Sequence, residues 1–181
     1  FVEEDFRFAR VLSGVTEMQP RWKRCLRATD GGLGDLLGKV YIAERFPPEA
    51  KARALRLVHN LEAALDDRLT TLEWMSDSTR KAAQVKLAAF TEKIGYPDKW
   101  RDYAGVEVKP QPFFQNRASV RQSEVTRQFN KIGKPTERGE WGMTPPTVNA
   151  FYSPTLNSIN FPAGILQPPF YDPAWDDAAN Y

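Results

Sequence analysis

Cysteine and histidine are nearly missing from this sequence of 181 residues, which has one of each. A single cysteine excludes a disulfide within the chain, and it excludes a zinc site built from several thiolates. A single histidine excludes any zinc site that takes two imidazoles from this chain. A catalytic dyad of Cys25 and His59 stays formally open, although nothing in their spacing supports it.

Long apolar runs and a strong charge of one sign are also absent. No run of about 18 apolar residues occurs, so the sequence predicts no membrane span. The 25 basic residues nearly balance the 23 acidic ones, and a net charge of +2 gives no electrostatic reason to expect nucleic acid as a partner. A short basic run around Trp22 is interpreted as a solvated face. The chain starts without a methionine or a signal-peptide pattern, and we therefore expect a piece of a longer protein.

Apolar residues at a spacing of three or four predict helices over about residues 33–46, 49–74, 76–95 and 113–132. The second of these has the clearest apolar stripe, which consists of Ala54, Val58, Leu61, Leu65, Leu69 and Leu72. Ser76 or Ser78 can cap the third helix, which is expected to bury Ile94 and to end at Gly95.

The pattern changes after Pro135. Residues 147–152 favour a strand, residues 153–157 have turn chemistry, and residues 158–161 can return as a second strand. Pro162 then ends the pairing, because proline has no backbone donor. The predicted fold class is therefore mainly α with a small β-hairpin.

Three features that suggest chemistry have simpler structural explanations. His59 has one possible ligand partner within a helical turn, Glu62, and it is interpreted as a solvated or capping side chain. Cys25 lies in a basic run that can make a thiol reactive, but a packed thiol, or one paired with a cysteine elsewhere, is favoured. Residues 30–34 look like a phosphate loop, but Leu37 occupies the position of the third glycine, so a turn leading into a helix is favoured.

A fourth feature is Asn149, which falls in a predicted strand although asparagine is depleted in strands. Its amide offers an acceptor oxygen and two donor hydrogens, so it can bond the backbone of an extended peptide. The alternative is that the amide satisfies a neighbouring turn. Composition alone leaves these two interpretations equal.

Longer motifs connect the chain to a known family. Two specific runs lie in the last quarter, VNAFY at residues 148–152 and FPAGILQPPF at residues 161–170. Three shorter runs precede them, PRWKRC at 20–25, LEWM at 72–75 and KIGYP at 93–97. On these motifs, over about residues 20–181, the chain closely resembles the neprilysin and endothelin-converting-enzyme family of zinc metallopeptidases. Residues 138–145 are similar to bacterial members.

The resemblance implies a mainly helical lid domain that faces a thermolysin-like α+β catalytic domain, with the active site between them. Residues 1–134 correspond to the helical part of the lid and its connecting helices, and residues 135–181 to the opening of the catalytic domain. The zinc helix of the family, H-E-x-x-H, would begin only about ten residues beyond Tyr181. We therefore expect zinc in the intact parent enzyme, no metal on this chain, and no peptidase activity of the chain alone.

The resemblance also implies site residues. In the family, an Asn-Ala pair on an edge strand bonds the backbone of an extended peptide substrate, and Asn149 and Ala150 match that pair. Ile165 and Phe170 match two walls of the apolar pocket for the side chain that follows the cleaved bond, which implies cleavage before hydrophobic residues. Asn160 departs from the apolar residue that the family often has, which leaves open how deeply the second strand is buried.

Together these residues imply part of a zinc-dependent endopeptidase, in which zinc and the glutamate of the zinc helix activate a water. The expected partners are an extended peptide and the remainder of the catalytic domain, and the expected location is extracytoplasmic, either periplasmic or secreted. The alternative is a stand-alone helical module that binds peptides without catalysis. A zinc helix encoded within about ten codons after Tyr181 would separate the two.

Overall fold

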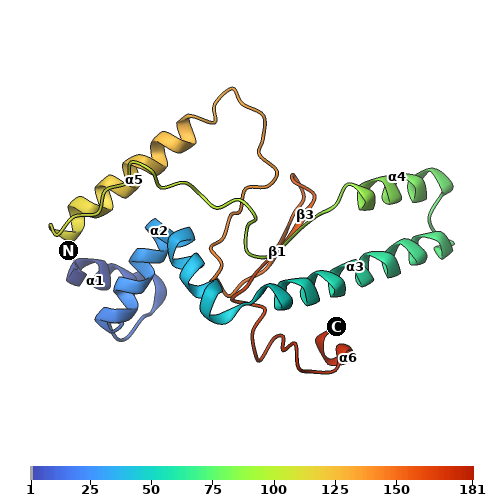
Figure 1. Cartoon of the computed structure of the whole chain (residues 1–181), viewed down its shortest axis with the longest axis horizontal. Helices are drawn as coiled ribbons and strands as arrows, with labels where there is room; N and C mark the ends of the chain where they lie inside the picture. Colours follow the sequence, from blue (N-terminus) through green and yellow to red (C-terminus); the bar gives the residue numbers. More distant parts are fainter. Residues whose placement is uncertain (1) are drawn as a thin grey trace.

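The computed structural model describes residues 2–181, and Figure 1 shows an elongated molecule with a small sheet near its centre. In the described range the chain forms six helices and a three-stranded sheet. The helices are α1 (Val2–Ser13), α2 (Arg21–Arg45), α3 (Pro48–Thr71), α4 (Asp77–Ala88), α5 (Phe113–Phe129) and α6 (Asp177–Asn180). The strands are β1 (Thr91–Gly95), β2 (Phe151–Ser153) and β3 (Ser158–Pro162). The predicted class is confirmed, with one strand added to the hairpin.

The predicted secondary structure was wrong at strand β1. We expected a helix to continue to Gly95, but α4 ends at Ala88 and β1 pairs in parallel with β3. Strand β3 is therefore central, with β2 antiparallel on its other side. Ile94 continues the apolar spacing of α4, which favours a helix. Backbone hydrogen bonds to β3, a strand distant in sequence, outweigh this local preference. The sheet joins residues from both sides of the boundary predicted between 134 and 135, and that boundary stays a prediction.

Helix α2 begins earlier than predicted and bends at Leu33, whose φ of −122° and ψ of 34° are not helical. The turn expected at residues 30–34 is thus a kink inside a longer helix. Gly38 is buried where α2 meets a proline-rich segment, and a Cβ added there would lie 2.7 Å from Cδ of Pro145. This glycine therefore serves close packing.

Helices α3 and α4 match their predictions closely at their starts. Pro48 occupies the first turn of α3, and the side chain of Ser76 accepts a hydrogen bond from the backbone of Thr79 to cap α4. The core forms where α2 and the first half of α3 meet the sheet, and its buried residues are Phe46, Ala50, Ala54, Val58, Ile94, Ala163 and Tyr171. Leu61 and Leu65, further along the predicted stripe, remain exposed.

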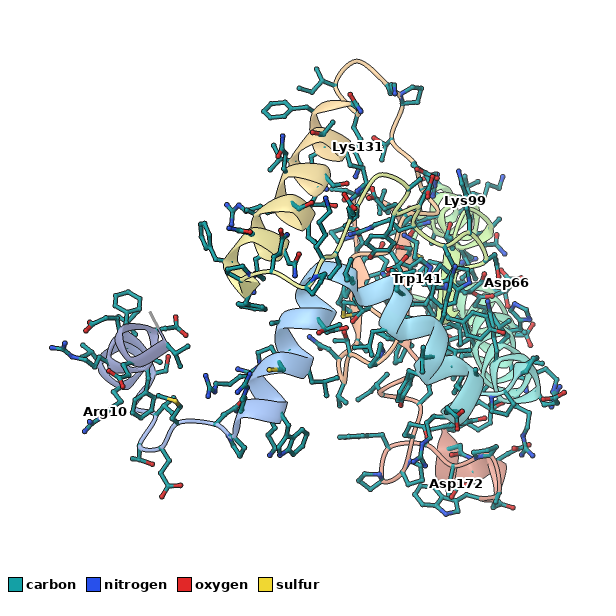
Figure 2. The ribbon with its side chains drawn as sticks, turned by 60° about the vertical axis from the view of Figure 1, so that its left-hand side comes forward. Arg10, Asp66, Lys99, Lys131, Trp141 and Asp172 are labelled. Carbon is teal, nitrogen blue, oxygen red and sulfur yellow. The ribbon has the colours of Figure 1, made fainter. Side chains whose placement is uncertain are left out.

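Helices α1 and α5 bury no residues. Figure 2 shows α1, marked by Arg10, standing apart from the rest of the chain. Helix α5 packs against α2, while the apolar side chains that predicted it, Phe114 and Phe129, face solvent. Among residues 2–181, none of the helices has both the length and the apolar character that crossing a membrane requires.

Candidate functional site

The residues predicted to bind substrate backbone lie just before the edge strand β2. The expectation of a strand over residues 147–152 was wrong for residues 147–150, because β2 begins at Phe151. In the hairpin register Phe151 faces Asn160, so Asn149 would face Pro162, which has no backbone donor to continue the ladder. Asn149 is exposed, and Ala150 is half-buried.

The side chain of Asn149 is only partly satisfied by the protein. Its Oδ1 accepts a hydrogen bond of 2.8 Å from the backbone N–H of Ala150. No hydrogen bond from its Nδ2 is found within residues 2–181, so both amide hydrogens remain free for a ligand. The geometry thus allows the local-turn role and the peptide-binding role together.

The hairpin turn is fixed to the end of α4. The hydroxyl of Tyr152 donates to Oδ1 of Asn157 at 3.0 Å, and Nδ2 of Asn157 donates to the carbonyl oxygen of Lys86 at 2.8 Å. The rings of Phe90 and Tyr152 stack with centroids 6.1 Å apart. These contacts hold the edge strand in a defined place relative to the helices.

Strand β3 is deeply buried, which answers the question that Asn160 raised. The residue is 2% exposed, and its Nδ2 donates to the carbonyl oxygens of Phe151 at 3.3 Å and Ser158 at 3.2 Å. These bonds offset the cost of burying an amide. The asparagine therefore replaces an apolar residue without exposing the strand.

A large apolar cavity, of about 740 Å³, lies between α3, α4, the sheet and residues 165–171. Ile165 and Phe170, the two predicted pocket residues, both line it, together with Leu61 and Leu65 from α3. Asn149 and Ala150 are not among its lining residues. The structure thus brings two of the four predicted residues into one cavity and leaves the other two beside the edge of the sheet.

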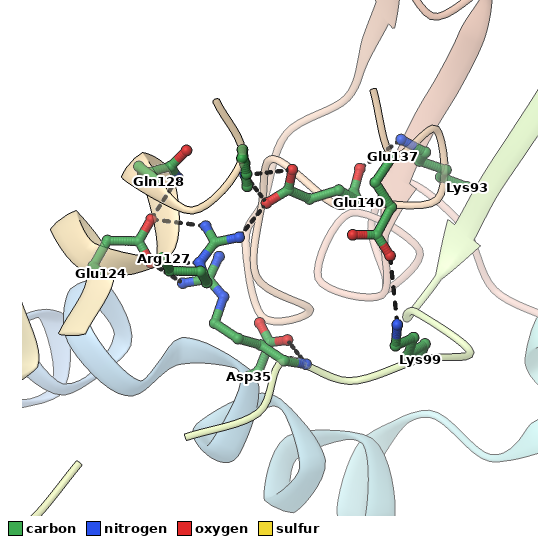
Figure 3. Close-up of polar contacts among 10 residues, drawn as sticks. Asp35, Lys93, Lys99, Glu124, Arg127, Gln128, Glu137 and Glu140 are labelled. Atoms are coloured by element: carbon green, nitrogen blue, oxygen red, sulfur yellow. Dashed lines mark hydrogen bonds and ion pairs between the residues drawn. The ribbon is translucent and has the colours of Figure 1, made fainter. Parts of the chain in front are cut away.

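A charged cluster that the sequence analysis did not single out ties α5 to the segment before the hairpin (Figure 3). We name it the α5–Glu140 clamp, and it consists of Glu124, Arg127, Lys131 and Glu140. Arg127 donates to Glu124 at 2.7 Å through Nη2 and to Glu140 at 2.5 Å through Nη1. Lys131 donates to both carboxylate oxygens of Glu140, at 2.6 and 2.7 Å. The sequence contains one sign of this clamp, since Glu124 and Arg127 have opposite charges and lie three residues apart on α5.

The clamp favours the charged forms of its acids. The hydrogen bond from Arg127 lowers the pKa of Glu124 from 4.5 to about 2. Burial alone would raise the pKa of Glu140, but hydrogen bonds from Lys131 and Arg127 outweigh it, and the pKa lies below its usual value. Lys93 of β1 is 4% exposed and donates to the carbonyl oxygen of Glu140 at 2.6 Å, while its burial lowers its own pKa. The clamp therefore reaches the sheet.

Cys25 and His59 are the remaining candidate residues of the sequence analysis. Cys25 is exposed, so the residues of this chain do not pack around its thiol, and its pairing with a cysteine elsewhere stays a prediction. His59 is mostly solvated, as expected, but its Nε2 lies 3.6 Å from Oε1 of Glu92. This neighbour was not predicted, because Glu92 was assigned to a helix that ends at Gly95.

The catalytic zinc site that the resemblance implies needs two imidazoles from one helix. Among residues 2–181, the one group of three or more potential ligands is His59, Glu62 and Glu92, which includes a single imidazole. The residues of this chain therefore do not fit that zinc site.

Sequence comparison gives two kinds of match. Two sequence models of peptidase family M13 match the chain, one over residues 1–97 and the other over residues 149–181. An endothelin-converting enzyme homolog of Locusta migratoria is 35% identical over 179 residues, which cover 95% of this chain and 25% of the relative. Endothelin-converting enzyme 1 of Homo sapiens is 36% identical over 192 residues, which cover 100% of this chain and 24% of the relative.

Solved structures give a consistent result. The zinc metalloprotease Zmp1 of Mycobacterium tuberculosis, in complex with an inhibitor, superposes with a TM-score of 0.87 at 43% identity, over 99% of this chain and 27% of that one. PepO from Lactobacillus rhamnosis superposes with a TM-score of 0.84 at 32% identity, over 96% of this chain and 28% of that one. The chain spans about a quarter of the length of the relatives it matches.

Proposed function

Because the chain belongs to peptidase family M13, we propose that it is part of a zinc-dependent endopeptidase and that its share of the work is to hold the peptide substrate. The names of its relatives, an endothelin-converting enzyme and a zinc metalloprotease, support this parent activity. In this proposal the zinc ligands belong to the rest of the parent protein. The chain alone is therefore inactive.

The free edge of β2 is the observation that supports a role in substrate binding. Within the described residues 2–181, strand β2 pairs with β3 on one side and with no strand on the other, so its other edge is open to an extended peptide. Such a peptide can add to the edge by backbone hydrogen bonds, and the free Nδ2 of Asn149 can donate to a peptide carbonyl oxygen. Ala150, next along the chain, contributes its backbone to the same contact. These bonds orient the peptide and supply no charge stabilisation.

The apolar cavity supports the proposed preference for hydrophobic residues after the cleaved bond. Ile165 and Phe170 line it, and burial of a leucine or phenylalanine side chain there stabilises the complex by about 1.5–3 kcal/mol. The cavity is larger than one side chain needs. We propose that the remainder of the catalytic domain, the second expected partner, covers part of it.

The substitution Asn149→Ala in the intact parent enzyme tests the role of the edge. Loss of one or two hydrogen bonds, each worth about 0.5–1.5 kcal/mol, should lower kcat/KM by about 5- to 100-fold. Much of the loss should raise KM, because the bonds hold substrate and transition state alike. Steady-state kinetics and thermal melting are the measurements. The matched control is Asn130→Ala, an exposed asparagine at the end of α5, which should leave kcat/KM unchanged.

Two outcomes of this experiment have opposite meanings. A lower kcat/KM at an unchanged melting temperature supports substrate binding by Asn149. An unchanged kcat/KM with a melting temperature lower by several degrees would make Asn149 a structural turn residue and remove the proposed role.

The substitution Phe170→Ala tests the pocket separately. It removes one wall, so the ratio of kcat/KM for a peptide with phenylalanine after the cleaved bond to that for a matched peptide with alanine should fall. Phe170 is 63% exposed in this chain, so its truncation should cost little folding stability. An unchanged ratio would exclude Phe170 from the pocket.

We further propose an extracytoplasmic location for the parent enzyme, periplasmic or secreted. The family resemblance supports it, and fractionation of cells that express the parent protein, with detection by an antibody to this chain, measures it. Recovery of the protein in the cytoplasmic fraction alone would contradict the proposal.

A further inference from the structure

Three potential metal ligands meet between α3 and β1. His59 and Glu62 lie one helical turn apart on α3, and Glu92 reaches them from β1. One ligand atom from each lies within 4.8 Å of the other two, and Nε2 of His59 is 3.6 Å from Oε1 of Glu92. All three side chains line one cavity of about 400 Å³. Pairing of β1 with β3 fixes the strand that brings Glu92 to the helix.

The cluster has more negative charge than its protein surroundings neutralise. Within residues 2–181, Glu92 forms an ion pair with His59 only, and no lysine or arginine pairs with Glu62. The Oε1 atom of Glu62 is shielded from solvent and has no hydrogen-bond partner. A buried carboxylate oxygen without a partner costs free energy, and a cation at this position would remove that cost.

We propose that His59, Glu62 and Glu92 bind one divalent cation of the zinc class and so join α3 to β1. One imidazole nitrogen and two carboxylate oxygens are ligands that Zn²⁺ accepts, and a water can complete a tetrahedral shell. Ligand atoms about 2.0–2.1 Å from such an ion lie about 3.4 Å apart, so binding draws the side chains together by up to about 1.4 Å. The imidazole is free to move, because the side chain of His59 is 58% exposed. The four residues proposed above to hold the peptide lie outside this cluster, although Glu62 also lines the apolar cavity that Ile165 and Phe170 share.

Zinc content of matched variants of the intact protein tests the site. Each variant is dialysed to equilibrium against micromolar Zn²⁺, and bound zinc per protein is measured by atomic emission. Zinc held elsewhere in the protein is common to all variants and cancels in the comparison. The variants are His59→Ala, Glu62→Gln and Glu92→Gln, with Asp67→Asn as the control, since Asp67 lies on the same helix but does not line the cavity.

Wild type and Asp67→Asn should bind one zinc more than each of the three ligand variants. Loss of one ligand should weaken binding at this site by more than about 10-fold. Zn²⁺ should also raise the melting temperature of wild type and Asp67→Asn above that of the ligand variants. Glu62→Gln keeps the shape of the side chain, so it reports on binding even where His59→Ala perturbs folding. Equal zinc content in wild type and a folded Glu62→Gln variant would overturn the proposal.

Discussion

Two of the junctions that attach the segment from residue 135 onward to the helices have opposite chemistry. The first, which we call the apolar junction, consists of two buried apolar clusters that share the neighbour Leu166. Ile94 belongs to one cluster, and Phe46 and Ala163 belong to the other, and these three residues are 2%, 1% and 0% exposed. The second is the α5–Glu140 clamp, in which the side chains of Arg127 and Glu140 are 28% and 31% exposed. Apolar burial stabilises without regard to direction, whereas partly exposed ion pairs contribute little free energy and fix orientation. The apolar junction should therefore determine stability and the clamp should determine geometry.

The largest expected effect comes from the apolar junction. Ile94→Ala should lower the free energy of unfolding by about 2–5 kcal/mol, because it removes buried methyl groups and leaves a cavity. Urea denaturation measures the loss. The control Val85→Ala on α4, where the side chain is 72% exposed, should change stability by less than about 0.5 kcal/mol. Equal effects of the two substitutions would remove the distinction between core and surface at β1.

Overpacking at α2 should have the next largest effect. Gly38→Ala places a methyl group against the ring of Pro145 and should cost about 1–3 kcal/mol. Gly31→Ala on the same helix meets nothing within 4 Å, so the gain in helix propensity should stabilise by up to about 1 kcal/mol. Thermal melting should therefore shift in opposite directions for the two variants. A shift in the same direction would show that α2 does not approach residue 145 this closely.

Loss of the clamp should cost less and should depend on salt. Arg127→Met keeps most of the aliphatic stem and should lower the free energy of unfolding by about 1 kcal/mol, since the ion pairs are partly exposed. Added sodium chloride should reduce this difference from wild type, because salt screens exposed charges. The deficit of Ile94→Ala should not shrink in the same way. A deficit of Arg127→Met that is independent of salt would assign the side chain to packing.

The smallest effect should appear on acidification. The pKa of Glu124 is lowered in the folded chain to about 2 from 4.5, so folding favours its charged form. The stabilisation is fully present above about pH 5 and is lost as the pH falls toward about 2. Denaturation of wild type and Glu124→Gln over this range should give a difference in stability that vanishes at the acid end. A difference that grows on acidification would have the wrong sign for a carboxylate paired with Arg127.

Local signals predicted most of the helices, and distant pairing accounts for most errors. Helix α3 and the cap of Ser76 depend on neighbours in sequence, and both were confirmed. Of the predicted stripe of α3, only Ala54, Val58 and Leu69 are buried. Strand β1 depends on β3, which the local spacing around Ile94 cannot report. The same error hid the approach of Glu92 to His59, because a residue assigned to the wrong element has the wrong neighbours.

The candidate site also has parts that the sequence predicted and parts that it did not. The motif that contains Ile165 and Phe170 predicted an apolar pocket, and the cavity they line forms largely from residues close to them in space but not in sequence. The clamp was missed, because Glu124, Arg127 and Lys131 resemble a solvated helix face until Glu140 is placed beside them. The roles of Asn149 and Ala150 in substrate binding stay predictions.

Parallel pairing of β1 with β3 also has a consequence for the order of folding. Thr91 pairs with Ser158, a separation of 158 − 91 = 67 residues, whereas α3 and α4 are neighbours in the chain. Closure of a long loop costs conformational entropy before the strand contacts can compensate, so the helical pair should form before the sheet. During synthesis β1 leaves the ribosome long before its partner exists. Its unpaired backbone is then open to other chains, and this interval is a stage at which the nascent protein is exposed to misassembly.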